Sequence, residues 1–224
     1  MRLVHRELEK GFALIELLLA VTLFGFVASS LIVVYQRVSD QLLITSSGYD
    51  MALSFREIQS YGVSVKQGAS GSFDAGYGLH FDTDSALNFV RFVDAPQGDP
   101  GIPFFYDGQD TDLGCVSGEC LSVLRLERGN TIQRFCGVLP DDGGRDAPAD
   151  AKHEECSTDS TPTSAPPPHI AFLDVVFRRP NPDAIIRTDR SGQVLYKAAR
   201  IYLVSPRGDT RVIEVVTTGQ ISVK

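Results

Sequence analysis

Residues 10–35 read KGFALIELLLAVTLFGFVASSLIVVY, and Glu16 is the one charged side chain in this run after Lys10. The 24 residues from Phe12 to Tyr35 would form about 36 Å of helix, enough to cross the ~30 Å hydrocarbon core of a bilayer. A carboxylate placed in hydrocarbon costs about 2.5–3.5 kcal/mol. The run therefore predicts a membrane helix in which Glu16 has a specific role and a positive partner outside this segment.

The start of this run resembles a known processing signal. Residues 10–18, KGFALIELL, are similar to the cleavage and methylation signal of bacterial type IV prepilins and of the pseudopilins of type II secretion. In that family a prepilin peptidase cuts after the glycine, which implies cleavage after Gly11 and N-methylation of the new terminal residue, Phe12. The resemblance also implies that Glu16 pairs with the N-terminal amine of a neighbouring subunit in a filament. It covers about the first 25 residues of the chain.

The residues before the hydrophobic run carry a slight positive excess: Arg2, His5, Arg6 and Lys10 against Glu7 and Glu9. Positive residues before a first span hold that end in the cytoplasm, so the rest of the chain is expected outside. A cleaved secretory signal has an apolar region of only about 7–15 residues, and a plain anchor leaves Glu16 unexplained. We expect a single-pass inner-membrane protein with its head outside the cytoplasm, and then an extracellular or periplasmic filament.

The helix is expected to continue beyond the membrane and to end near Gly62, because glycine readily takes the left-handed position after a helix. That predicts one helix of about 50 residues, near 75 Å long. Its second half should pack on a sheet through an apolar stripe, consisting of Ile44, Met51, Phe55 and Ile58 with Gly48 between them. The opposite face is expected to be polar, with Arg37, Asp40, Gln41, Ser47 and Arg56.

Three small residues share one face of the membrane half of the helix. Thr22, Gly25 and Ser29 are spaced at i, i+3 and i+7. Small residues let helices approach closely in lipid, so this face suits the packing of many such helices at a filament centre. Glycine is also commoner in membrane helices in general, which explains Gly25 equally well.

From Val63 the hydrophobic period changes to that of strands, with alternating, aromatic-rich runs separated by glycine, proline and aspartate. Two hairpins are expected, one joining residues 121–126 to 131–135 and one joining 199–204 to 210–217. A helix followed by antiparallel strands predicts an α+β fold of the pilin type. Residues 202–223 also resemble the closing strands of pseudopilin heads, although Gln220 stands where arginine is usual.

The expected organisation therefore has four parts. Residues 1–11 form the leader, 12–35 the membrane and filament-core helix, 36–62 its amphipathic continuation, and 63–224 a β-rich head. Within the head, residues 139–169 are rich in proline, serine, threonine and glycine and predict a long exposed loop. This composition permits O-glycosylation, although an unmodified loop explains it as well.

The four cysteines are expected to form disulfides in an oxidising compartment. Two pairings are open: Cys115 with Cys120 across a small loop and Cys136 with Cys156, or Cys120 with Cys136 across a hairpin and Cys115 with Cys156. A bond that closes a loop of ~20 residues would stabilise the head by roughly 3 kcal/mol. Their spacings do not match the paired knuckles of zinc sites.

Asp107, Asp110 and Asp112 form an acidic cluster in a loop of the head. Oxygen ligands at nearly alternate positions can hold calcium, and some pseudopilins carry calcium in their loops. The loop lacks the glycine and the closing glutamate of an EF-hand, and acidic turns are usually only solvated. Calcium is thus one interpretation of this cluster, and no other cofactor is expected.

Composition excludes further classes of function. The chain has 224 residues, a net charge of −7 and a pI of about 5.1, which argues against a dedicated nucleic-acid surface. Enzyme motifs such as a P-loop or a nucleophile elbow do not occur, and no enzyme is expected. The expected function is a structural subunit, a minor pilin or pseudopilin, whose partners are other subunits, the prepilin peptidase and the inner membrane. The alternatives are a binding module at a filament tip and a tethered domain without a filament.

Overall fold

The computed structural model describes residues 14–64, 75–94, 104–111, 114–140, 154–157, 169–190 and 196–224. The chain divides into two compact units, Met1–Gln41 and Leu42–Lys224. One α-helix occurs in the described part, α1 (Leu14–Val63), and its 50 residues agree with the helix of about 50 residues that the sequence predicts. All the strands lie in the second unit, which is called the head below.

The head contains two five-stranded antiparallel sheets. The first has the order β5-β2-β1-β8-β9, with β1 Gly76–Asp82, β2 Asn88–Asp94, β5 Cys120–Arg125, β8 Phe172–Arg178 and β9 Asn181–Thr188. The second has the order β12-β11-β10-β6-β7, with β6 Thr131–Val138, β7 Glu154–Cys156, β10 Ala198–Val204, β11 Thr210–Val216 and β12 Ile221–Val223. A short pair, β3 (Gln109–Thr111) and β4 (Gly114–Ser117), completes the described strands. The predicted α+β class is confirmed.

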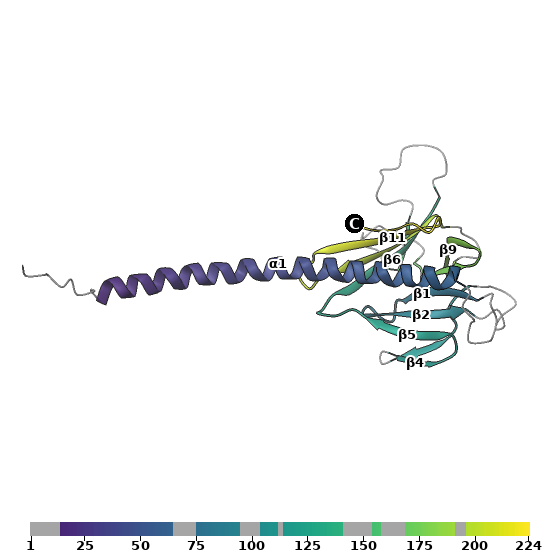
Figure 1. The fold of residues 1–224 in the computed structure, drawn as a ribbon, viewed down its shortest axis with the longest axis horizontal. Helices are drawn as coiled ribbons and strands as arrows, with labels where there is room; N and C mark the ends of the chain where they lie inside the picture. The colour runs from purple at the N-terminus through teal and green to yellow at the C-terminus, as the bar shows by residue number, and fades with distance from the viewer. Residues whose placement is uncertain are drawn as a thin grey trace, which may run out of the picture. The chain divides into compact units, whose positions relative to one another are not determined.

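The part of α1 that belongs to the head packs on both sheets. Figure 1 shows the blue end of the helix lying along the strands, with β6 and β11 on one side and β1 and β2 on the other. The predicted stripe faces inward: Ile44, Met51, Phe55 and Ile58 are at most 1% exposed and share one core with both sheets. Residues on a single helical face thus join the two sheets, which makes the helix part of the hydrophobic core rather than a cover over it.

Polar contacts fix this part of the helix at four points along its length. Listed along the helix, Thr45 contacts Arg211, Ser47 contacts Asn130, Glu57 contacts Arg91 and Gln59 contacts the carbonyls of Pro182 and Gly219. Ser47 had been expected on the polar face, and that prediction is wrong. It lies next to the buried stripe, where its hydroxyl accepts a hydrogen bond from Asn130 at 2.8 Å.

The two sheets differ in how their outer faces are covered. In the first sheet a second apolar cluster of Val90, Phe92, Tyr106 and Val176 covers the face away from the helix, so β1 and β2 are buried almost continuously. In the second sheet β10 alternates between buried and half-buried residues, which is the pattern of a strand with one solvated face. Both faces of the first sheet are therefore covered at β1 and β2, whereas one face of the second sheet is solvated at β10.

The predicted hairpin over residues 121–135 is wrong, although its turn is present. The amide of Asn130 donates to the carbonyl of Glu127, and Arg128 and Gly129 both have positive φ, as a type I′ hairpin turn requires. However, β5 pairs with β2 and β6 pairs with β10, in different sheets. The strands diverge because the residues beside the turn bond elsewhere: the amides of Leu126 and Ile132 donate to the carbonyls of Leu87 and Ala86.

The second predicted hairpin is confirmed. β10 pairs with β11 in register from Ala198 opposite Val216 to Val204 opposite Thr210. The turn between them is closed by a hydrogen bond from the amide of Ser205 to the carbonyl of Asp209. β11 then pairs with β12, where the resemblance to pseudopilin heads had placed the closing strands.

Gly62 has a different role from the one that the sequence suggested. The helix continues through it to Val63, and Gly62 is not among the glycines with positive φ. A Cβ atom at this position would lie 2.5 Å from the carbonyl oxygen of Phe177 in β8. Glycine is thus required because the helix and the strand approach closely, not because the helix ends there.

We predict that Gly62→Ala destabilises the head by about 1–3 kcal/mol, because the added methyl group must displace the backbone of β8. Gly25→Ala is the matched control, since no atom lies within 4 Å of a Cβ built at Gly25. Chemical unfolding of the full chain in detergent, followed by near-ultraviolet circular dichroism, measures both. Equal stability of the two variants would show that the close approach at Gly62 is not a constraint.

Candidate functional site

The candidate assembly site is the amino-terminal part of α1. Glu16 lies in the first turn of the helix as described, and it is exposed. Gly11 and Phe12, the predicted cleavage and methylation positions, lie outside the described residues. Their role stays a prediction.

The residues that follow Glu16 form an unusually apolar helix surface. Leu14–Ile32 is the one stretch of described helix long and apolar enough to cross a membrane, and none of it is buried in the chain's own structure. Its exposed large side chains include Leu14, Ile15, Leu18, Phe24, Phe26 and Leu31. Contiguous apolar surface of this kind normally marks contact with lipid or with other chains. The helix could equally serve as a membrane anchor or as part of a signal sequence.

The predicted packing face has its polar atoms satisfied within the helix. The Thr22 hydroxyl donates to the carbonyl of Leu19 at 2.9 Å, and the Ser29 hydroxyl donates to that of Phe26 at 2.9 Å. No hydroxyl on this face therefore needs water, which suits it to hydrocarbon or to a neighbouring helix. Gly25 lies between them with open space around it. The packing role of the three residues is not tested by these contacts.

The cysteines form two disulfides in the head, Cys115–Cys120 and Cys136–Cys156, with Cα–Cα distances of 5.4 and 4.0 Å. This is the first of the two pairings considered from the sequence. The second relied on Cys120 facing Cys136 across a hairpin, and β5 and β6 lie in different sheets. Disulfides are typical of proteins outside the cytoplasm, so the head suits an extracytoplasmic location.

The predicted calcium ligands are only partly described. Asp107 is exposed on the segment after Tyr106, whereas the side chain of Asp110 and the whole of Asp112 lie outside the description. Calcium binding by this cluster stays a prediction. A group of Cys136, Glu154 and Cys156 also has metal-ligand spacing, but its two sulfur atoms are bonded to each other and offer no thiolate.

A buried ion pair on the first sheet was not predicted. His80 in β1 and Asp174 in β8 are 8% and 0% exposed, and His80 Nδ1 lies 2.6 Å from an Asp174 oxygen. Burial by itself lowers the pKa of His80, but hydrogen bonds to Asp174 and Asp82 outweigh it and raise the pKa to about 9. Burial raises the pKa of Asp174. Nothing in the sequence indicated this pair, because His80 and Asp174 are 94 residues apart.

Asp174 also holds a segment across the outer face of the first sheet. Its second carboxylate oxygen accepts a hydrogen bond from the amide of Tyr106 at 2.9 Å, and Asp94 accepts one from the amide of Phe104 at 2.8 Å. Phe104 has a φ of 74°, which is uncommon for a bulky residue, and its ring lies under the guanidinium of Arg178. These contacts keep Phe104 and Tyr106 packed over the second apolar cluster.

The outer face of the second sheet carries a charged network centred on Arg200. Arg200 forms ion pairs with Glu154 in β7 and with Glu214 in β11, and Glu214 also pairs with Lys224. Desolvation by itself raises the pKa of Glu214, but hydrogen bonds from Lys224 and Arg200 outweigh it and lower the pKa. The network joins three strands across the sheet. It explains how charged residues fit the half-buried positions of β10 and β11, and it provides no nucleophile or open metal site.

Comparison of the chain with models of known protein families, with curated proteins and with solved structures found no significant match. The agreement with pilin architecture therefore rests on the fold: an N-terminal apolar helix whose later half packs on antiparallel sheets.

The His80–Asp174 pair predicts a specific dependence of stability on pH. A histidine with a raised pKa contributes stability that is fully present below pH ~6.5 and is lost as pH rises through its folded pKa, about 9. We expect the free energy of unfolding to fall by about 3 kcal/mol over this range. Denaturant unfolding from pH 6 to 9.5 measures it, and His80→Gln should flatten the slope. An unchanged slope in that variant would show that His80 is not its source.

The two disulfides should differ in their contribution to stability. Replacing Cys136 and Cys156 with alanine should cost roughly 3 kcal/mol, against roughly 2 kcal/mol for Cys115 and Cys120, because the first pair closes the longer loop. Denaturant unfolding of the two double variants measures the difference. A larger loss for the Cys115–Cys120 pair would mean that local packing, not loop length, determines their effects.

Proposed function

We propose that this chain is a structural, non-enzymatic subunit of a type IV pilus-like filament, a minor pilin or a pseudopilin. After cleavage behind Gly11 and N-methylation of Phe12, it assembles with other subunits through its amino-terminal helix. The observation that carries the proposal is a single charged side chain, Glu16, in the predominantly apolar stretch Leu14–Ile32 of α1, in which no residue is buried. The resemblance of residues 10–18 to prepilin signals implies the partner of that carboxylate, which is the amine of Phe12 in the neighbouring copy.

The mechanism follows from the charges. Cleavage would create a positive amine at Phe12, and in lipid both that amine and Glu16 of the next copy lack water. Opposite charges 4 Å apart attract by about 4 kcal/mol at an effective dielectric constant of 20. Removing either partner leaves an unpaired charge in an apolar place, which is more costly than losing the pair's attraction alone. Pairing between copies thus sets the axial register while the apolar helices bundle.

The head supports this role through its construction. Stripe residues such as Phe55 and Ile58 fix the second half of α1 in the core, while the first half has no contact that buries it. A filament needs such a division, since one half of the helix must be free to join other chains. A tethered domain without a filament needs only an apolar anchor and gains nothing from Glu16.

We predict that Glu16→Ala and Glu16→Gln are still processed but reach filaments at about one tenth of the normal level or less, because neither supplies the negative charge. Glu16→Asp keeps the charge on a shorter side chain and should retain part of the assembly. Subunit content of sheared surface or overexpressed filaments, quantified against membrane-bound chain, measures incorporation. Loss of the leader on a denaturing gel measures processing.

Normal incorporation of Glu16→Ala would refute the charge-pairing mechanism but would still be compatible with a role as a filament subunit. Absence of the wild-type chain from every filament preparation, in cells that process it, would favour the tethered domain.

A further inference from the structure

A groove in the head lies between α1 and the end of β5, beside the buried stripe and the Ser47–Asn130 hydrogen bond. It has a volume of about 370 Å³, within the range of small-molecule sites, ~300–1,000 Å³. Its apolar lining includes Met51 from the helix and Phe89 from β2, and its rim carries Asp50, Glu127 and Arg128. A cavity with an apolar floor and a few convergent polar groups is the usual form of a ligand site.

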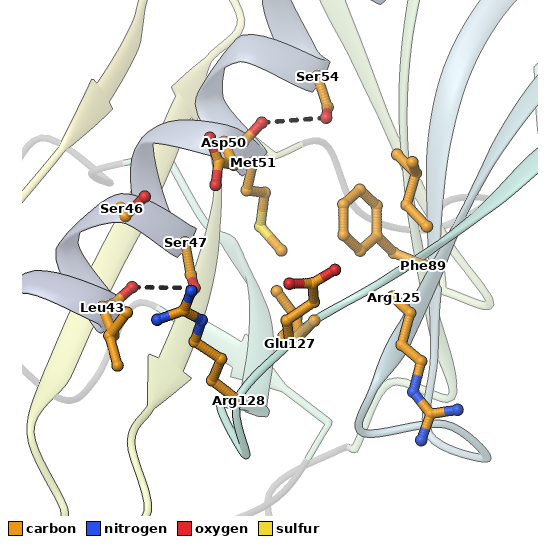
Figure 2. Close-up of a pocket in the computed structure, with 12 residues that line it drawn as sticks. Leu43, Ser46, Ser47, Asp50, Met51, Ser54, Phe89, Arg125, Glu127 and Arg128 are labelled. Atoms are coloured by element: carbon orange, nitrogen blue, oxygen red, sulfur yellow. Dashed lines mark hydrogen bonds between the residues drawn. The ribbon is translucent and has the colours of Figure 1, made fainter. Parts of the chain in front are cut away.

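The side chains of Asp50, Arg125, Glu127 and Arg128 make no ion pair within the part of the chain that the structure describes. Figure 2 shows the Glu127 carboxylate turned toward Met51 and Phe89, the Arg128 guanidinium turned toward Ser47, and Arg125 directed away from the helix. Two adjacent residues of opposite charge, Glu127 and Arg128, therefore line the groove, and the carboxylate of Asp50 is a second negative group on its rim.

Arg128 is an unusual residue for its position in the turn. Its φ is 60°, and the first central position of a type I′ turn favours asparagine, aspartate or glycine. A non-glycine residue held in this conformation is strained, and such strain occurs most often at functional sites. The turn conformation does not require arginine, since asparagine suits it better. What arginine adds at this position is a guanidinium group at the groove.

The wall that carries Arg128 is rigid. Asn130, 2% exposed, donates its amide hydrogen to the Ser47 hydroxyl at 2.8 Å, and Ser47 donates to the carbonyl of Leu43 at 3.1 Å. This chain of hydrogen bonds ties the turn to the helix across the end of the groove. A ligand would meet a turn that is already held against the helix, which lowers the entropy lost on binding.

We propose that this groove binds a small zwitterionic ligand with an apolar body, a free apolar amino acid. Arg128 would hold the carboxylate, since guanidinium groups match carboxylates with two parallel hydrogen bonds. Glu127 would hold the ammonium group, and the apolar side chain would lie over Met51 and Phe89, which are 1% and 5% exposed and line the groove through little surface. Adjacent residues of opposite charge complement the two charged groups of an amino acid, which are bonded to the same carbon atom. The proposal does not depend on filament assembly, because the groove is complete in one copy of the head.

The experiment uses L-leucine as the probe and the full chain in detergent, labelled with ¹³C at methionine methyl groups. The chain has two methionines, Met1 and Met51, so one of two signals reports directly on the groove. We expect a saturable shift of the Met51 signal. N-acetyl-L-leucine lacks the ammonium group and L-leucinamide lacks the carboxylate, and each should bind about tenfold more weakly or worse.

Arg128→Asn is the decisive variant because it separates binding from folding. Asparagine suits the turn, so the melting temperature should stay the same or rise, whereas affinity for L-leucine should fall by about tenfold or more. Glu127→Gln should lose affinity for L-leucine to a similar extent while keeping the wild-type affinity for N-acetyl-L-leucine, which has no ammonium group for Glu127 to hold. Arg56→Gln is the control, since Arg56 is exposed on α1 and does not line the groove. It should bind like wild type.

The absence of a saturable Met51 shift would overturn the proposal. So would equal binding of leucine and its two blocked forms, or wild-type affinity in Arg128→Asn. None of these results would bear on filament assembly, which the Glu16 variants test separately.

Discussion

The structure depends on one packing constraint, the insertion of a single helical stripe between two antiparallel sheets. Phe55 and Ile58 are fully buried, and the cluster that contains them includes residues of both sheets. The helix cannot be removed without opening the core, so the head and the second half of α1 form one folding unit. Gly62 shows how tight this packing is, because no Cβ fits between the helix and Phe177.

The first half of the helix has no comparable burial among the residues that the structure describes. Burial that stabilises the head reaches Ile44, whereas Leu14–Ile32 has no buried residue. Such a surface is stable only in lipid or against other apolar helices. The proposed function follows from this division: the head is complete by itself, and the amino-terminal helix with its one carboxylate is not. The groove at Arg128 belongs to the complete part and would act independently of assembly.

Local patterns predicted the helix well because they are set by local rules. The apolar run and the stripe from Ile44 to Ile58 identified α1 and its buried face, and the 205–209 turn identified β10 and β11.

The prediction of a β5–β6 hairpin was wrong because a turn sequence determines only the geometry of the turn. Which strand pairs with which was decided by distant partners, Leu87 for one strand and β10 for the other. The His80–Asp174 pair was invisible for the same reason, since its residues lie on strands far apart in sequence. The groove had no sequence signal beyond an arginine where a turn prefers asparagine.

The central claim is that the chain becomes a filament subunit once its leader is removed and a charged amine is exposed beside an apolar helix. The most direct test is intact mass spectrometry of the chain recovered from sheared filaments of cells that contain a prepilin peptidase. The account predicts a mass that corresponds to residues 12–224 with one methyl group, and fragmentation should place that group on the amine of Phe12. A chain that begins at Met1 in those filaments, or that begins at Phe12 but remains entirely in the membrane, would contradict it.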